Sequence, residues 1–189
     1  NRHRRILDIG CGAGQTLIGS NLENGVFAVG VDVDHAALVL GKQLSFAIYF
    51  VNGRGEALPF RNNSFDLVIC RVSLPYMHIA SALSEMARIT VADGDIWLVL
   101  HPFSMTAKEL STNLTHLELK AAVYRLWVLI NGLTLNSLGK QMHWPGEANR
   151  YETWQTSNGI RRALSSAGFD QIRISRGTHF VAAATRRSP

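Results

Sequence analysis

The stretch that decides the fold lies almost at the start of the chain: Ile6-Leu7-Asp8-Ile9-Gly10-Cys11-Gly12-Ala13-Gly14-Gln15-Thr16. Residues 5–9 predict a buried strand, and an apolar helical pattern begins near Gln15. The three glycines between them predict a tight turn, because glycine adopts backbone angles that other residues avoid and lets a ligand approach the main chain. The N–H groups at the start of the helix would then face that ligand. The stretch therefore predicts a strand–turn–helix binding site of the α/β type.

The glycine spacing and Asp8 indicate the kind of ligand. The pattern is G-x-G-x-G, whereas dinucleotide sites use G-x-G-x-x-G. Asp8 stands two positions before Gly10, and a carboxylate repels a pyrophosphate but attracts a cation. The stretch resembles motif I of the class I S-adenosylmethionine-dependent methyltransferases, whose cofactor carries an ammonium and a sulfonium but no phosphate. A glycine turn with a purely structural Asp8 is the alternative.

The bulk composition indicates one globular domain over residues 1–189. Apolar residues make up 47% of the chain and charged residues 17%, which excludes a disordered protein. The net charge is +5, but the basic residues lie mostly near the two ends and form no stripe interleaved with aromatic residues. We therefore do not expect a nucleic-acid partner. No uncharged apolar run reaches the length of a transmembrane helix.

The two cysteines, Cys11 and Cys70, fall at the ends of predicted strands and do not have the spacing of metal ligands. Two buried thiols fit a reducing compartment better than a disulfide scaffold does, so we expect a cytoplasmic protein without a metal. The chain opens on Asn1, directly before the first strand. That opening is compatible with a fragment that lacks its natural N-terminus.

The second predicted strand ends at an acidic residue. Residues 26–31 form a continuous apolar run, typical of a parallel strand covered on both faces. Asp32 follows about twenty residues after the glycine loop, where a carboxylate is needed to accept hydrogen bonds from a ribose diol. Asp34 is expected to cap the next helix, over residues 35–45. The alternative is that both aspartates serve only as caps.

A third strand is predicted over residues 47–51 and a fourth ends at Cys70. The stretch from Glu56 to Ile69 resembles the "EALPF…NSFDLVI" signature of small-molecule methyltransferases related to the ubiquinone- and menaquinone-pathway enzymes. In those families an acidic residue just after the third strand contacts the adenine amino group. Here that position is Arg54, which cannot accept a hydrogen bond. The resemblance then leaves the adenine to the backbone of Arg54 and Gly55, or to a shifted Glu56.

The resemblance covers residues 4–101 through motifs, including E-x-x-R at residues 85–88, and residues 157–185 through layout. It implies a Rossmann-like α/β fold: a seven-stranded sheet, mostly parallel with an antiparallel last strand, and helices on both faces. S-adenosylmethionine is the cofactor that it implies. The residues implied for binding it are Asp8, Gly10, Cys11, Gly12, Gly14, Asp32, Val33, Arg54, Gly55, Glu56, Cys70 and Arg71.

Three side chains are candidates for contact with the methyl acceptor. Tyr76 and His78 follow the fourth strand in a loop that faintly resembles the Pro-Pro-Tyr loop of amino-group methyltransferases, and His101 ends the predicted fifth strand, residues 96–100. Each could position an acceptor or take its proton. A base is needed only if the acceptor carries a proton, because a sulfonium methyl is already activated. Alternatively, Tyr76 packs in the core and His78 lies near a helix N-cap.

Residues 103–154 are expected to be a helical insertion within the domain, with helix over 107–138 and then an aromatic loop. Such an insertion can act as a lid that excludes water. Tyr76, Trp144, Tyr151 and Trp154 could line an acceptor pocket, or the tryptophans and Tyr151 could merely pack the insertion onto the domain. The sequence thus predicts methyl transfer to a small apolar or aromatic molecule. The alternatives are a non-catalytic S-adenosylmethionine-binding module and an RNA methyltransferase.

Overall fold

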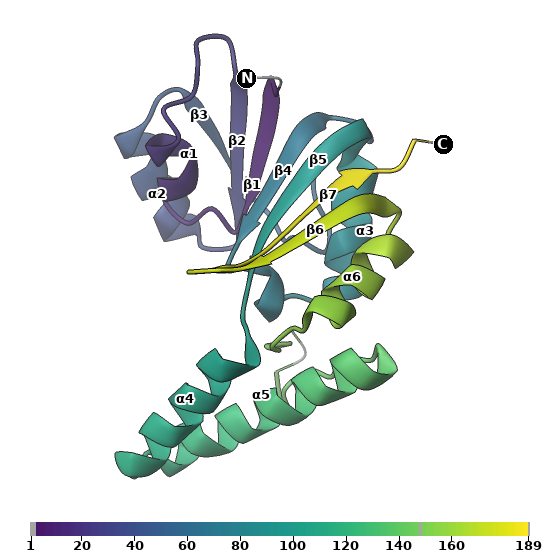
Figure 1. The fold of residues 1–189 in the computed structure, drawn as a ribbon. Coiled ribbons are helices and arrows are strands. Elements are labelled where there is room, and N and C mark those ends of the chain that lie inside the picture. Colours follow the sequence, from purple (N-terminus) through teal and green to yellow (C-terminus); the bar gives the residue numbers. More distant parts are fainter. Residues whose placement is uncertain (1–2, 148, 189) are drawn as a thin grey trace.

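One seven-stranded sheet forms the centre of the computed structural model, which describes residues 3–147 and 149–188 (Figure 1). The strand order is β3-β2-β1-β4-β5-β7-β6. Strand β7 is antiparallel to β5 and β6, and the other neighbouring pairs are parallel, as predicted. The strands are β1 (Arg5–Ile9), β2 (Phe27–Asp32), β3 (Ile48–Asn52), β4 (Phe65–Arg71), β5 (Thr90–Leu100), β6 (Phe169–Arg176) and β7 (Phe180–Arg186).

Helices cover both faces of the sheet. Leu17 of α1 and Leu38 of α2 pack on one face, and Met86 of α3 and Leu164 of α6 pack on the other. Successive residues of a strand point to opposite faces, so the apolar runs of the central strands fill both cores. The helices are α1 (Gln15–Gly19), α2 (His35–Leu44), α3 (Ile79–Ile89), α4 (Phe103–Thr115), α5 (Leu119–Leu138) and α6 (Ser157–Ser166), with a short 3₁₀ helix η1 (Leu74–Tyr76).

The structure departs from the predicted elements in three places. Helix α1 is shorter than the apolar pattern over residues 15–22 predicts, and it ends at Gly19. The helix expected over 107–138 is two helices, because the chain turns at Leu117 with a positive φ of 55°. The fifth strand, predicted over residues 96–100 after a turn at residues 92–95, begins at Thr90, and the expected turn lies inside β5, where the pairing with β4 skips and Asp93 has a φ of 58°. Neither Leu117 nor Asp93 is a glycine, the residue that would have signalled a left-handed backbone.

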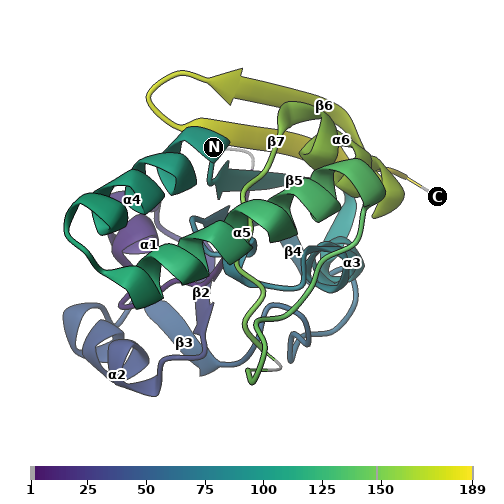
Figure 2. The same ribbon diagram turned by 90° about the horizontal axis from the view of Figure 1, so that it is seen from below.

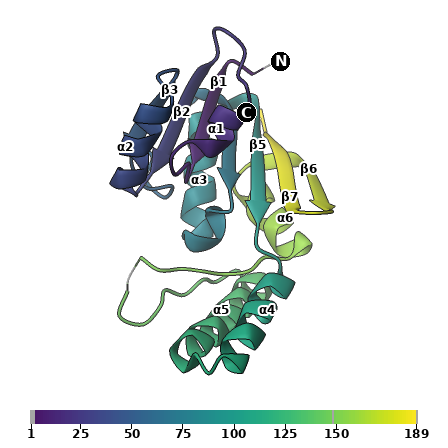
Figure 3. The same ribbon diagram turned by 90° about the vertical axis from the view of Figure 1, so that its left-hand side faces the viewer.

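The inserted helices α4 and α5 lie side by side, beyond the end of β5 (Figures 1 and 2). The segment that follows α5 passes between this hairpin and the sheet (Figure 3). It is bonded on both sides: the Asn131 side chain of α5 donates to the Glu152 carbonyl at 3.1 Å, and the Thr153 N–H donates to the Pro75 carbonyl at 2.9 Å. In the described part of the chain, no helix is long and apolar enough to cross a bilayer.

The insertion leaves and rejoins the sheet at one point. The Gln155 N–H donates to the His101 carbonyl at 2.9 Å, and the His101 N–H donates to the Gln155 side-chain oxygen at 3.2 Å. Pro102 and Gln155 also form an isolated parallel bridge. The entry and the exit of the insertion are therefore fastened to each other.

A charged pair on α3 holds the loop that precedes β4. The Arg88 guanidinium binds the Glu85 carboxylate at 2.7 Å and donates to the Leu58 and Phe60 carbonyls. Glu85 in turn accepts from the Leu58 N–H at 2.8 Å, and these bonds, led by the one from Arg88, lower the pKa of Glu85. This is the structural meaning of the E-x-x-R pattern, which joins the helix to the loop.

We expect Arg88→Ala to lower the free energy of unfolding by about 2 kcal/mol, because it removes several hydrogen bonds from a charged donor. Urea denaturation at pH 7 measures this loss. Arg88→Lys should cost less, since it keeps the charge but not the forked geometry. Arg161→Ala is the control: Arg161 is exposed and makes one bond, to the Ile172 carbonyl. Equal losses for Arg88→Ala and Arg161→Ala would contradict the prediction.

Candidate functional site

The glycine loop joins the ends of β1, β2 and β4. The Gly10 N–H donates to the Val31 carbonyl at 2.8 Å, and the Ser73 hydroxyl donates to the Gly10 carbonyl at 3.2 Å. Gly10 has a φ of 70°, and a Cβ there would lie 2.0 Å from the Ser73 Oγ. Only glycine fits at this position, because both the backbone angle and the close approach of Ser73 exclude a side chain.

Asp32 fixes the glycine loop from the end of β2. Its Oδ2 accepts from the Gly12 N–H at 2.7 Å and its Oδ1 accepts from the Asp34 N–H at 2.9 Å. Asp34 accepts from the Ala36 and Ala37 N–H groups and so caps α2, which confirms the role expected of it. Asp32 itself caps no helix. Each of its oxygens keeps a lone pair for a further donor.

A pocket of about 560 Å³ opens at these strand ends, a size typical of small-molecule sites. It brings together six of the twelve residues predicted for the cofactor. They are Gly10, Asp32, Val33, Arg54, Gly55 and Glu56. Of the other six, Asp8, Cys11 and Cys70 are buried, and none lines the pocket.

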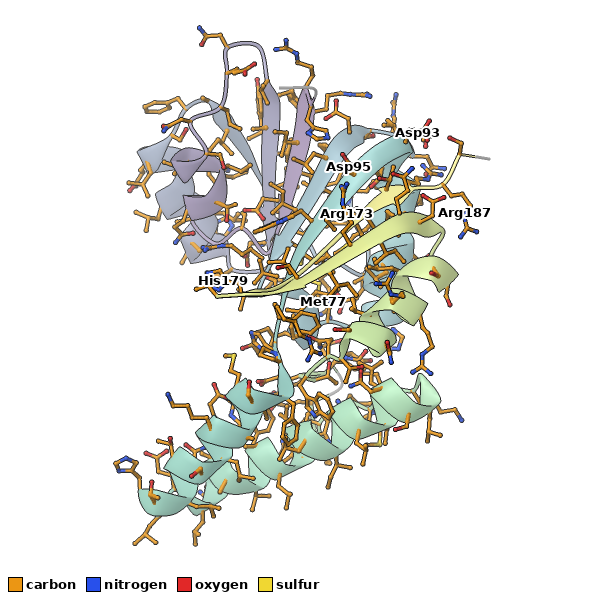
Figure 4. The ribbon with its side chains drawn as sticks, viewed as in Figure 1. Met77, Asp93, Asp95, Arg173, His179 and Arg187 are labelled. Carbon is orange, nitrogen blue, oxygen red and sulfur yellow. The ribbon has the colours of Figure 1, made fainter. Side chains whose placement is uncertain are left out.

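The wall of the pocket after β3 is tightly packed. A Cβ on Gly55 would lie 2.5 Å from the sulfur of Met77, so glycine is required for that contact. Met77 lies on the side of the sheet that faces the insertion, while Asp93 lies at the far end of β5 (Figure 4). Glu56 Oε1 accepts from the His78 N–H at 3.1 Å and lies 3.7 Å from Arg54 Nη2. Glu56 thus places an acidic group beside Arg54.

Asp8 is a buried carboxylate that makes no hydrogen bond of normal geometry in the described part of the chain, although the Thr16 hydroxyl is near enough to favour its ionised form. Burial raises its pKa from the ordinary value of 3.8 to about 7, although Thr16 and the positive charge of Arg71 oppose the rise. Leaving a buried ionisable group unpaired is costly. Asp8 lies behind the lining of the pocket, and a cationic group bound at the glycine loop would supply the missing partner, so the carboxylate fits the ammonium of S-adenosylmethionine.

His78 caps α3. Its Nδ1 lies 2.8 Å from the Ser81 hydroxyl and accepts from the Ser81 N–H at 3.4 Å. Its ring packs edge-on against Tyr151, with ring centroids 5.3 Å apart. His78 does not line the pocket. This arrangement matches the alternative expected for His78, a residue near a helix N-cap.

Tyr76 lines the pocket, and its ring packs edge-on against His101 with centroids 5.3 Å apart. Burial raises the pKa of Tyr76 and lowers that of His101. At neutral pH Tyr76 therefore keeps its proton and His101 is uncharged. The Nε2 atom of His101 is buried and has no hydrogen-bond partner among the described residues.

The aromatic side chains that were predicted to line the acceptor pocket have different surroundings. Trp154 packs over Gly132 of α5 and donates from Nε1 to the Leu129 carbonyl at 3.1 Å. Neither Trp154 nor Tyr151 lines the pocket at the strand ends. Trp144 lines a second cavity of about 900 Å³, between α4, α5 and the following segment, and Tyr76 lines both cavities.

The structure adds residues that the sequence did not single out. Val72, Ser73, Met77 and Asn149 line the first pocket. The sequence indicates Ser73 and Met77 only indirectly, through the glycines at 10 and 55. Ser73 and Met77 occupy the space that a side chain at those positions would need. Among the residues that the structure describes, no group of three His, Cys, Asp or Glu side chains is placed to hold a metal.

Comparison with known proteins shows which sequences and structures this site is similar to. Residues 7–98 match the family described as "Methyltransferase domain". An uncharacterized methyltransferase, YcgJ of Bacillus subtilis, is 33% identical over 107 residues, which are 51% of this chain and 40% of the relative. The demethylmenaquinone methyltransferase of Renibacterium salmoninarum is 35% identical over 102 residues, which are 53% of this chain and 42% of the relative. The chain thus spans less than half the length of these curated relatives.

A solved structure supports the fold over nearly the whole chain. A possible histamine N-methyltransferase from Thermotoga maritima superimposes with a TM-score of 0.67 at 14% identity, covering 99% of this chain and 83% of its own. The fold is that of the Rossmann-like S-adenosylmethionine-dependent methyltransferases. Within that fold, residues 7–98 are similar in sequence to the methyltransferase domain family.

The raised pKa of Asp8 predicts how stability changes with pH. Between about pH 4 and pH 7 the folded protein holds a proton on Asp8 that the unfolded chain has released, so stability falls as the pH rises through this window. Asp8→Asn removes this pH dependence of stability. We expect it to gain stability relative to the wild type by up to about 4 kcal/mol between pH 4 and pH 8.

Urea denaturation of both proteins at pH 4, 6 and 8 measures this difference. Asp170→Asn is the control, because Asp170 is at the surface and lies 3.7 Å from Arg187. A difference between Asp8→Asn and the wild type that does not vary with pH would contradict the expected burial of the carboxylate.

Proposed function

We propose that this chain transfers the methyl group of S-adenosylmethionine to a small molecule with an aromatic or apolar part. The observation that carries the proposal is the unpaired, buried Asp8 directly before a glycine loop that Asp32 holds in place. A dinucleotide would bring a pyrophosphate to this loop, and the carboxylate at 8 disfavours that charge. A zwitterionic amino acid attached to a nucleoside fits both acids.

The assignment of the cofactor residues follows from their positions. Asp8 would bind the methionine ammonium, and Asp32 would accept hydrogen bonds from the ribose hydroxyls. Val33 and Gly55 would lie against the adenine, and Glu56 would accept from its amino group. The acidic group that the family places at position 54 would thus come from two residues further along the chain, where the His78 N–H already orients it.

The reaction demands little acid–base chemistry of the protein. Bound S-adenosylmethionine supplies an activated methyl group, so catalysis depends chiefly on positioning and on excluding water. Tyr76, with its raised pKa, would donate a hydrogen bond to the acceptor rather than remove a proton. The Nδ1 atom of His78 is engaged with Ser81, so we assign His78 to the helix cap and not to the reaction.

The insertion is the proposed lid and acceptor site. Its segment after α5 is bonded to η1 through Thr153 and Pro75, next to Tyr76. A small-molecule acceptor is in line with the relative named demethylmenaquinone methyltransferase and the structural neighbour titled possible histamine N-methyltransferase. The cytoplasmic location expected from the two thiols is part of the same proposal.

Calorimetric titration with S-adenosylhomocysteine tests the cofactor site. We expect micromolar binding by the wild type and at least about 30-fold weaker binding by Asp32→Ala, a loss of about 2 kcal/mol. Asp34→Ala is the matched control. It removes the cap of α2 and costs about 1 kcal/mol of stability, but it should leave the affinity within about twofold.

Two results would contradict the cofactor assignment. Equal losses of affinity in Asp32→Ala and Asp34→Ala would show that Asp32 acts only through the fold. No binding by the wild type, with NAD binding in its place, would overturn the proposed function. Binding without methyl transfer to any acceptor would leave a non-catalytic S-adenosylmethionine-binding module as the function.

The pH dependence of the same titration tests the role of Asp8. An ionised Asp8 is required to pair with the ammonium, so the dissociation constant should fall by up to about tenfold between pH 6 and pH 8. Asp8→Asn should bind weakly and with no such dependence. A wild-type affinity that is constant over this pH range would show that Asp8 does not pair with the ammonium.

A further inference from the structure

The second cavity adjoins the proposed cofactor pocket. Its volume is about 900 Å³, and Tyr76 is the residue that lines both cavities. Any acceptor that reaches the cofactor from the insertion side therefore passes Tyr76.

Both acidic residues of this cavity form an ion pair with Arg125. Its Nε lies 3.2 Å from Glu109 Oε2, and its Nη1 binds the Glu152 carboxylate. Glu152 is buried and also accepts from the Tyr124 hydroxyl at 2.7 Å. Both carboxylates are therefore engaged within the protein.

Three other cationic side chains line the wall, and only one of them forms an ion pair in the described part of the chain. Arg150 pairs with Glu147 at 3.1 Å. Lys108 of α4 and Lys120 of α5 both line the cavity and form no ion pair within the described ranges 3–147 and 149–188. Two ammonium groups on facing helices raise the local concentration of anions. The Thr112 hydroxyl and the Asn113 amide add neutral hydrogen-bond donors to the same wall.

The other side of the cavity is aromatic. The Tyr124 and Trp144 rings meet edge-on with centroids 5.0 Å apart, and the Arg150 guanidinium lies 4.1 Å from the centre of the Tyr124 ring. The cavity thus offers both a flat apolar surface and a cationic one.

We propose that the methyl acceptor is an organic anion, with an aromatic or apolar body against Trp144 and Tyr76 and a carboxylate or phosphate group between Lys108 and Lys120. The proposal rests on the proposed methyl transfer and narrows its substrate class. A wholly apolar acceptor would leave the two ammonium groups facing its surface without a counter-charge, which disfavours that class.

The test compares charged and neutral probes of the same shape. Indole-3-acetate, 2-naphthoate and benzoate are titrated into the protein saturated with S-adenosylhomocysteine, each beside its primary amide, and phenyl phosphate is titrated beside phenol. We expect at least one anion to bind at least about tenfold more tightly than its neutral counterpart at 50 mM salt, and to lose this preference at 500 mM salt because exposed charges are screened.

The double variant Lys108→Gln/Lys120→Gln should lose the preference for the anion while keeping the wild-type affinity for S-adenosylhomocysteine. Lys42→Gln, on α2 and outside the cavity, is the matched control and should behave as the wild type. A carboxylate preference or a phosphate preference identifies which anion the site takes.

The proposal is overturned if no anion binds, if the neutral probes bind as well as the anions, or if the preference survives in the double variant. If the wild type does not bind S-adenosylhomocysteine, that result would instead count against the proposed function. The two failures are therefore distinguishable in one set of titrations.

Discussion

The hydrogen bond from the Gly12 N–H to the Asp32 carboxylate is the interaction on which the candidate site depends. It fastens the loop after β1 to the end of β2, while Ser73, after β4, fastens the same loop from the other side. Strands β2 and β4 flank β1 in the sheet, so their carboxyl ends converge on one point. A ligand pocket is expected outside the strands where the order of connection reverses, and the 560 Å³ pocket lies there.

Asp8 shows that the fold loses stability by building this pocket. An apolar residue at this position of β1 would pack beside Ile6 without cost, whereas the buried carboxylate makes no hydrogen bond of normal geometry among the described residues. Unpaired buried polar groups cluster at functional sites because a ligand completes them. The same holds for the buried Nε2 of His101, which lies beside Tyr76 on the insertion side.

Much of the strand domain could be predicted from the sequence. The glycine loop, the apolar runs and the helix cap at Asp34 are local signals, and the fold that they predicted is the one observed. The separation of α4 from α5 could not be predicted, because Leu117 adopts a positive φ without the usual residue type.

The candidate site was predictable only in part, for a related reason. The cap at His78 and the packing of Trp154 over Gly132 depend on residues that are close in space but not in sequence. The positive charge of the second cavity could not be predicted from the sequence either. Lys108 and Lys120 look like ordinary surface lysines until the hairpin of α4 and α5 brings them to one cavity.

The way in which the insertion joins the sheet has a consequence for evolution. Because His101 and Gln155 are bonded to each other, the insertion begins and ends at one place, and the chain between them can change in length without moving the neighbouring strands. Apart from Asn149, the residues that line the pocket with Gly10 come from other segments. A lineage can therefore replace the hairpin of α4 and α5 while the glycine loop and the strand ends around it stay unchanged.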